Sequence, residues 1–266
     1  MRNTHPMHTP SLLRFAFACC TAFALNAQAA ESSTPVWSTQ AKQLVLVEAA
    51  DWAAPSGELR RYEREDSGAQ WQRVGEPQSV ALGRTGSAWG IGLHTLPQPG
   101  PIKREGDGKS PAGAFAIGPA FGYAINENTA LPYHAMQETD YCIDVPQSPL
   151  YNQLVDAAQV GKDAVKGSTE PMRLDIHNDG DPRYRIGFVI AHNPQNAPGA
   201  GSCIFAHLTR REGEATAGCT AMEDAAMQAL LGWLDPSRDP VFVLLPQAEL
   251  ARLATAWGLP QPEVSP

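Results

Sequence analysis

Residues 203–231 read CIFAHLTRREGEATAGCTAMEDAAMQALL, and this stretch holds the strongest structural signals of the chain. Its first six residues form an apolar run that is typical of a buried strand. Thr220-Ala221-Met222-Glu223 is a capping-box pattern, and beyond it apolar residues recur at helical spacing as far as Leu234. The stretch therefore predicts a strand, a loop and a helix, with Cys219 directly before the N-terminus of that helix.

Outward from this stretch, the chain shows short apolar runs separated by frequent turn residues, with 23 Gly and 23 Pro. This pattern predicts a mainly β domain (β-rich α+β) with a few helices, one of them over Gln247–Trp257. A long irregular region over residues 131–171, with a short helix near 149–159, is more typical of a lid or binding loop than of a linker. The predicted strands are Gln43–Ala49, Glu58–Arg64, Gln70–Gly75, Ser79–Leu82, Ala114–Gly118, Tyr184–His192, Cys203–Leu208 and Val241–Leu245.

The first thirty residues have the three parts of a secretory signal peptide. Arg2 and Arg14 supply the positive charge, Leu12–Leu25 is a short apolar core, and Ala27-Gln28-Ala29 fits an Ala-x-Ala cleavage site. We therefore expect residues 1–29 to be removed and residues 30–266 to form a single domain that is exported, to the periplasm or the cell wall. A buried N-terminal helix is the alternative interpretation.

The charge of the chain argues against two classes of partner. It carries 28 acidic and 20 basic side chains, a net charge of −8. Nucleic-acid binding depends on neutralising phosphates with basic residues, and docking on anionic lipid needs basic residues too. No segment beyond the leader is apolar enough to cross a bilayer. We therefore expect no nucleic-acid partner and no membrane association after the leader is cleaved.

Three of the five cysteines follow the predicted leader: Cys142, Cys203 and Cys219. An odd number in an oxidising compartment leaves at least one thiol unpaired or bound to another chain. A bond between Cys142 and Cys203 would tie the long irregular region to the strand before His207. Two buried free thiols are the alternative.

Cys219 is the candidate nucleophile. Unpaired N–H groups and the dipole at a helix N-terminus would favour the thiolate and could hold an oxyanion. Gly218 allows a tight turn before it, and with Thr216 and Thr220 it forms the loop that would support the site. A structural or disulfide cysteine is the alternative interpretation.

His207 is the candidate base for this thiol. It ends the apolar run twelve residues before Cys219, and a loop of that length can return beside the end of the strand. The imidazole could then form a Cys/His pair. A structural role is the default for one histidine at a strand end, and four other histidines compete for the catalytic role: His94, His134, His177 and His192.

Two motifs together resemble a known family. Phe205-Ala206-His207, followed by Thr216 to Met222, is similar to the signature of L,D-transpeptidase catalytic domains of the YkuD type. Upstream, Lys109-Ser110-Pro111, within the segment 106–115, is similar to the second hallmark of that family. The resemblance spans about residues 43–246. It implies a β-sandwich catalytic fold with Cys219 at the mouth of a cleft and a helix after it.

The resemblance also implies an activity. Members of the family attack the peptide bond between a diamino acid and the terminal D-amino acid of a peptidoglycan stem, which makes stem peptides the expected partner. On this interpretation Cys219 carries the acyl group, and His207 takes the thiol proton and later serves the incoming amine. No metal or organic cofactor is implied, and no metal-ligand spacing is present. Two alternatives stay open: a stem-peptide hydrolase of the same fold, and a non-catalytic wall-binding protein.

The chain departs from the family pattern at two positions near the nucleophile. Ala217 stands where many members have His, and Ala221 stands where many have Arg. Arg210, Arg211 or Arg173 could supply the missing charge, although a solvated surface role is the simpler interpretation for each. The residues predicted to bind the peptide are Arg210, His192, Asn193 and Tyr133.

Overall fold

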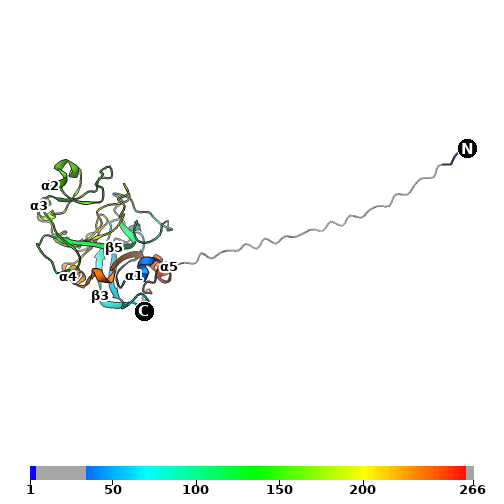
Figure 1. Ribbon diagram of the computed structural model, residues 1–266, viewed down its shortest axis with the longest axis horizontal. Helices are drawn as coiled ribbons and strands as arrows, with labels where there is room; N and C mark the ends of the chain where they lie inside the picture. Colours follow the sequence, from blue (N-terminus) through cyan, green and yellow to red (C-terminus); the bar gives the residue numbers. More distant parts are fainter. Residues whose placement is uncertain (4–33, 97, 262–266) are drawn as a thin grey trace. The chain divides into compact units, whose positions relative to one another are not determined.

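A bent β-sheet organises the computed structural model, which describes residues 1–3, 34–96 and 98–261 (Figure 1). The chain divides into two units, Met1–Ser32 and Ser33–Pro266. The leader predicted over residues 1–29 therefore lies almost wholly outside the described residues. The second unit is mostly β with few helices, which confirms the predicted fold class.

The strands of the main sheet pair in a circuit that closes on itself. The order runs β10-β11-β12-β3-β2-β1-β13-β5, and β10 pairs again with β5. The long strand β5 makes this closure possible, because its first half pairs with β13 and its second half with β10. The strands of the sheet are β1 Gln43–Ala49, β2 Ser56–Glu63, β3 Gln72–Ala81, β4 Ser87–Trp89, β5 Ser110–Gly122, β6 Tyr133–Ala135, β10 Ile186–Ile190, β11 Phe205–Leu208, β12 Thr220–Met222 and β13 Val241–Pro246.

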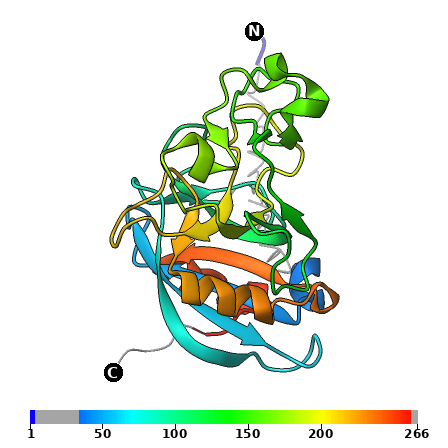
Figure 2. The same cartoon turned by 90° about the vertical axis from the view of Figure 1, so that its left-hand side faces the viewer.

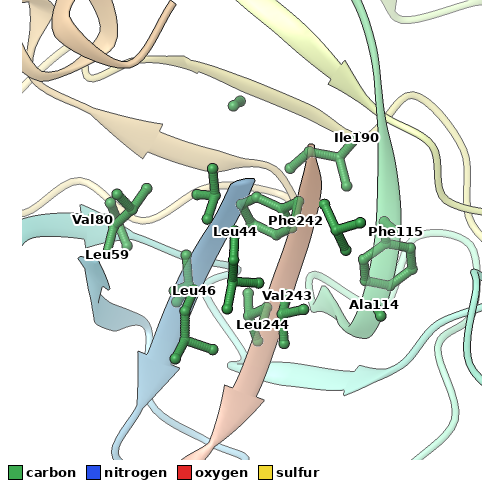
Figure 3. Close-up of a cluster of buried hydrophobic side chains, with 14 of the residues drawn as sticks. Leu44, Leu46, Leu59, Val80, Ala114, Phe115, Ile190, Phe242, Val243 and Leu244 are labelled. Carbon is green, nitrogen blue, oxygen red and sulfur yellow. The ribbon is translucent and has the colours of Figure 1, made fainter. Parts of the chain in front are cut away.

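The centre of the core lies where β1 and β13 run parallel, starting from the pair Leu44 and Val241. Both strands are nearly continuous apolar runs, as expected for strands that are covered on both faces. Figure 3 shows Leu44 and Leu46 beside Phe242 and Leu244. These side chains are at most 2% exposed. Their burial holds the strands that carry the site in place.

Two helices pack against this core. α5 covers Gln247–Trp257, as predicted, and ends at Gly258, whose positive φ of 61° suits a helix C-cap. α4 covers Asp224–Trp233 and buries Met227, Leu230 and Leu231. A short helix, α1 Val36–Gln40, precedes β1 in the chain. Its Trp37 ring packs edge-on against the Trp257 ring of α5.

The predicted start of α4 is wrong. Thr220–Met222 is not the first turn of the helix but strand β12, which pairs in parallel with β11. The N-cap is Glu223, and its side chain makes no capping hydrogen bond; it accepts instead from the Thr209 hydroxyl at 2.7 Å. All three residues of β12 are buried, so pairing with β11 overrides the local capping pattern.

The two strands predicted after residue 69 are one strand. β3 runs from Gln72 to Ala81 and pairs antiparallel with β2, with a register irregularity near Leu59. The predicted turn near Ser67-Gly68 joins the two strands. β3 continues through the polar and turn-forming residues Gly75-Glu76-Pro77. This part of the strand is largely exposed, so it needs no apolar residues.

The region over residues 131–171 contains a second, smaller sheet in the order β8-β7-β9. It forms the green part above the main sheet in Figure 2. The helix predicted near 149–159 is wrong in extent, because α2 begins only after the Asp156 cap. The elements here and directly after it are β7 Asp140–Cys142, β8 Leu154–Asp156, α2 Ala157–Val160, η1 Lys162–Val165, β9 Glu170–Pro171 and α3 Leu174–His177. Elsewhere, η2 Pro236–Arg238 lies between α4 and β13 in the chain.

Across the described ranges, no helix combines the length and the apolar character needed to span a membrane.

Candidate active site

The two sequence motifs meet at the backbone of Cys219. The hydroxyl of Ser110, at the start of β5, donates to the Cys219 carbonyl at 3.0 Å, and the Thr216 hydroxyl donates to the same oxygen at 2.7 Å. The Ser110 hydroxyl also accepts from the N–H of Gly83 at 2.9 Å. Gly218 lies so close to Lys109 that a Cβ there would stand 3.0 Å from its carbonyl oxygen. Distant segments of the chain therefore fix the position of Cys219.

The sulfur of Cys219 is buried, and Cys219 is the free cysteine among the described residues. Its Sγ accepts from the Phe205 N–H at 3.4 Å, and the thiol donates to the Cys203 carbonyl at 3.5 Å. Both partners belong to the chain that leads into β11. The side chain is 8% exposed, so a narrow access remains.

Burial, and after it the negative charge of Glu170, raises the pKa of Cys219 to about 12. The Phe205 N–H and the more distant Arg183 oppose this rise without cancelling it. The prediction that a helix N-terminus lowers this pKa is wrong, because β12 stands between Cys219 and α4. The Cys219 side chain is therefore a neutral thiol at neutral pH.

His207 lies on the same face of the sheet as Cys219. In the β11–β12 pairing His207 is opposite Ala221, two residues beyond Cys219, and side chains two residues apart share a face. This offset is roughly 6.6 Å along the neighbouring strand. Within the described residues no hydrogen bond joins the imidazole to the thiol.

The imidazole of His207 is arranged as a neutral base. Its Nδ1–H donates to the Leu208 carbonyl at 2.8 Å, which leaves the lone pair on Nε2. Burial lowers the pKa of His207 to about 4. The edge of the Tyr184 ring packs against the imidazole, with ring centres 5.4 Å apart. A neutral thiol and a neutral imidazole on one face of the sheet would suit general-base activation of the thiol rather than a preformed ion pair.

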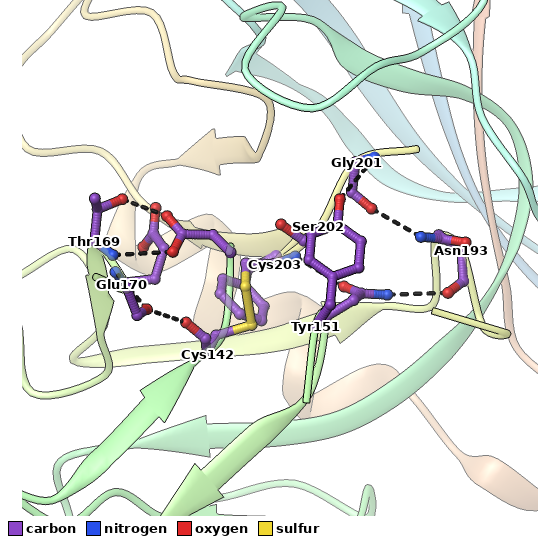
Figure 4. Close-up of a disulfide and its surroundings, with 12 residues drawn as sticks. Cys142, Tyr151, Thr169, Glu170, Asn193, Gly201, Ser202 and Cys203 are labelled. Atoms are coloured by element: carbon purple, nitrogen blue, oxygen red, sulfur yellow. Dashed lines mark hydrogen bonds between the residues drawn. A yellow bond between two sulfur atoms is a disulfide. The ribbon is translucent and has the colours of Figure 1, made fainter. Parts of the chain in front are cut away.

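Cys219 opens into a cavity of about 180 Å³. One wall comes from the loops around β5 and the other from the smaller sheet, which contributes Thr169 and Glu170. Figure 4 shows these two residues beside the disulfide. The lining residues are Arg84, Lys103, Glu105, Gly106, Asp144, Thr169, Glu170, Ser202, Cys203, Ile204, Ala217, Gly218 and Cys219.

A disulfide joins Cys142 in β7 to Cys203, just before β11 (Figure 4). Cys203 has a positive φ of 55°, a conformation that is uncommon for a residue with a side chain. Its carbonyl oxygen accepts the hydrogen bond that the Cys219 thiol donates. The bond therefore ties the smaller sheet to the immediate surroundings of Cys219.

A model of the L,D-transpeptidase catalytic domain (YkuD) matches residues 57–243, more than half of the chain and both motifs. The protein belongs to the L,D-transpeptidase family. This match confirms the resemblance read from the two motifs. Members of the family are cysteine-dependent transpeptidases, so the domain is of the transferase type. No curated protein and no solved structure shows a significant match.

The four residues predicted to bind the peptide do not line the Cys219 cavity of this L,D-transpeptidase domain. Arg210 is exposed and pairs with Glu214 and Asp181. The Tyr133 hydroxyl donates to the Ala124 carbonyl at 2.8 Å. Both side chains hold local structure, which corrects the prediction for them.

His192 and Asn193 are buried beneath the loop over residues 193–201. His192 Nδ1 accepts from the Ile91 N–H at 3.2 Å, and its Nε2–H donates to the Ala200 carbonyl at 2.9 Å. Asn193 donates to the Gly201 carbonyl at 3.1 Å. Since these polar groups are satisfied internally, they shape the loop before Cys203 instead of meeting substrate.

Several residues of the site escaped sequence reasoning. Glu105, Tyr184 and Glu170 lie outside both motifs, and their sequence surroundings carry no catalytic pattern. Arg173, considered as a substitute cation, pairs with Asp175 and stacks on the Tyr123 ring. Only the length of the irregular region around residue 170 indicated that it would contribute to a binding site.

Thr216 and Thr220 have different roles in the site. Thr216 accepts from the Gly218 N–H at 3.0 Å while donating to Cys219, so it shapes the loop as predicted. Thr220 is buried within β12 and pairs with Ala206 instead of capping a helix. Among the described residues, no group of three or more His, Cys, Asp and Glu side chains is placed to hold a metal ion.

Proposed function

We propose that this protein is an exported peptidoglycan L,D-transpeptidase that acts on stem peptides through an acyl-enzyme on Cys219. Family membership supports the class of reaction. One observation carries the assignment to this cysteine. The Ser110 hydroxyl, from one motif, donates a hydrogen bond to the carbonyl of Cys219, from the other motif, and Cys219 lines the cavity. The leader-like residues 1–29 support export, and cell fractionation with N-terminal sequencing of the mature protein tests it.

The first half of the proposed reaction forms a thioester. His207 Nε2 takes the thiol proton as the Cys219 sulfur attacks the carbonyl carbon of the scissile bond. The C–N bond breaks, and the terminal D-amino acid leaves with the proton returned by His207. In the second half, an amine attacks the thioester carbonyl, the C–S bond breaks, and the thiol is restored. Amine as acceptor gives a crosslink, and water gives hydrolysis.

The test is intact-protein mass spectrometry with a tetrapeptide stem as donor. We expect an adduct of the donor mass minus the terminal amino acid on the wild type, and none on Cys219→Ala. His207→Gln should reduce the rate of adduct formation by about 10²-fold or more, the size of a general-base contribution. Undiminished turnover by Cys219→Ala would exclude the mechanism.

Product analysis then separates the two acceptors. Crosslinked dimer indicates an amine, and free tripeptide without dimer indicates a stem-peptide hydrolase. A protein that folds normally but forms neither the adduct nor a product would instead be a non-catalytic member of the family.

A further inference from the structure

The Cys219 cavity is acidic. Three of its lining residues are carboxylates, Glu105, Asp144 and Glu170, and none of them forms an ion pair within the described part of the chain. Of the two cations on its lining, Lys103 is already paired with Asp107 at 2.6 Å. Arg84 is the second cation on the lining, so the three carboxylates outnumber the positive charges. A pocket with an excess of negative charge attracts a cationic group.

Glu170 differs from the other two carboxylates in its hydrogen bonds. Both oxygens of Asp144 accept from Thr169, and both oxygens of Glu105 accept from neighbouring donors. Glu170 Oε2 accepts from the Tyr184 hydroxyl at 2.7 Å, whereas Oε1 accepts no hydrogen bond from the residues that the structure describes. Glu170 Oε1 is thus the carboxylate oxygen among these three residues that is left for a ligand.

Glu170 is also held close to the reacting atoms. The Tyr184 side chain that binds it packs against both His207 and Phe205, and the Glu170 charge acts on the Cys219 thiol. Within the smaller sheet, Glu170 lies opposite Cys142. Figure 4 shows Glu170 beside the disulfide that links this strand to the chain before β11. The disulfide and the tyrosine together set the position of the carboxylate.

We propose that Glu170 is a specificity-determining residue that selects an amine as the acyl acceptor by binding its ammonium group at Oε1 and taking one proton from it. This inference rests on the proposed function, because it needs a thioester on Cys219. It favours amine transfer over hydrolysis, since water brings no positive charge to the carboxylate.

The proton and electron balance is complete within the site. The acceptor ammonium gives one proton to Glu170, and the nitrogen lone pair forms a C–N bond with the thioester carbonyl carbon. The C–S bond breaks, and its electron pair leaves on the Cys219 sulfur. The second amine proton passes through His207 to this sulfur, and Glu170 releases its own proton to water.

The surroundings of Glu170 suit it to this exchange. Burial raises its pKa to about 7, the Tyr184 hydroxyl and Arg183 lower it, and the charges of Asp144 and Glu105 raise it. Cys219 faces the same cavity as a neutral thiol, and Arg84 and the paired Lys103 lie on its lining. A carboxylate with a pKa near 7 can both accept and release a proton close to neutral pH.

The test uses Glu170→Gln, which keeps the shape of the side chain and removes its charge. Wild type and variant are acylated with the stem donor and then given glycinamide or hydroxylamine at pH 7. Glycinamide must lose a proton before it attacks, whereas hydroxylamine is already uncharged at this pH. We expect the variant to lower the ratio of glycinamide to hydroxylamine product by about tenfold or more, the loss of one hydrogen bond to a charged group.

Asp163→Asn is the matched control, because Asp163 is an exposed carboxylate of the same region outside the cavity. It should leave the product ratio unchanged. An unchanged ratio in Glu170→Gln, with the thioester still formed, would overturn the role of Glu170 and leave the proposed function intact. Absence of a thioester in the wild type would instead overturn the proposed function.

Discussion

At the scale of single residues, the site combines two buried and uncharged partners. Burial raises the pKa of Cys219 to about 12 and lowers that of His207 to about 4, so neither is ionised at neutral pH. On the proposed mechanism, the thiolate forms only as its proton moves to the imidazole.

This arrangement predicts the acid limit of acylation. His207 acts as a base only when neutral, and its lowered pKa keeps it neutral until the pH falls to about 4. We expect kcat/KM for thioester formation to stay level as the pH is lowered from 7 to 5 and to fall only near 4. Stopped-flow mass analysis across this range checks it. A loss centred on 6.5, the ordinary value for histidine, would contradict the prediction.

At the scale of elements, the strand pair β11–β12 and the start of β5 position the residues of the candidate active site. β11 ends with His207 and Leu208, β12 begins directly after Cys219, and Ser110 opens β5. Parallel pairing brings the imidazole and the thiol to one face of the sheet, and the Ser110 hydroxyl locks the loop between them.

Ser110→Ala tests this role of β5. It removes one of the two hydroxyls that hold the Cys219 carbonyl and leaves the Gly83 N–H without its acceptor. We expect the free energy of unfolding to fall by about 1–3 kcal/mol and acylation to slow by about tenfold, since a displaced nucleophile reacts poorly. Urea denaturation and adduct kinetics measure the two effects.

Ser67→Ala, in the exposed turn between β2 and β3, is the control for Ser110→Ala. It should change neither quantity. If Ser110→Ala lost stability without any loss of acylation rate, the hydroxyl would serve the fold alone and not the placement of the thiol.

At the scale of the whole molecule, the disulfide joins the smaller sheet to the main sheet within one buried cluster, which contains both Cys142 and Cys203. It links the smaller sheet to the segment just before β11, across a sequence separation of 61 residues. The main core and the cluster around Phe121, Tyr184 and Phe205 lie on opposite faces of β11. The covalent link therefore sets how the smaller sheet covers the cavity.

The double variant Cys142→Ala and Cys203→Ala removes this link and spares Cys219. We expect the free energy of unfolding to fall by about 2–5 kcal/mol and limited proteolysis to cut first within residues 143–170. Urea unfolding and mass analysis of the fragments check both expectations. Equal protease resistance of the wild type and the double variant would show that packing alone holds the smaller sheet.

Much of the framework could be predicted from local sequence. β1 and α5 have their predicted limits, because each is a strong apolar pattern with clear turn or cap residues at its ends. β12 could not be predicted, since three residues form a strand only when β11 lies beside them. Arg210, His192, Asn193 and Tyr133 were misplaced because residue type shows the capacity to bind and not the direction of a side chain.

Sequence by itself determined the β-rich class and the family, because strand periodicity and two compact motifs are local properties of the chain. It also predicted Cys219 and His207 as the reacting pair. Tertiary structure alone decided the protonation states of these two residues and the place of Glu170 beside them. The physical reason is that burial and neighbouring charge set a pKa, and both depend on which distant segments the folded sheet brings together.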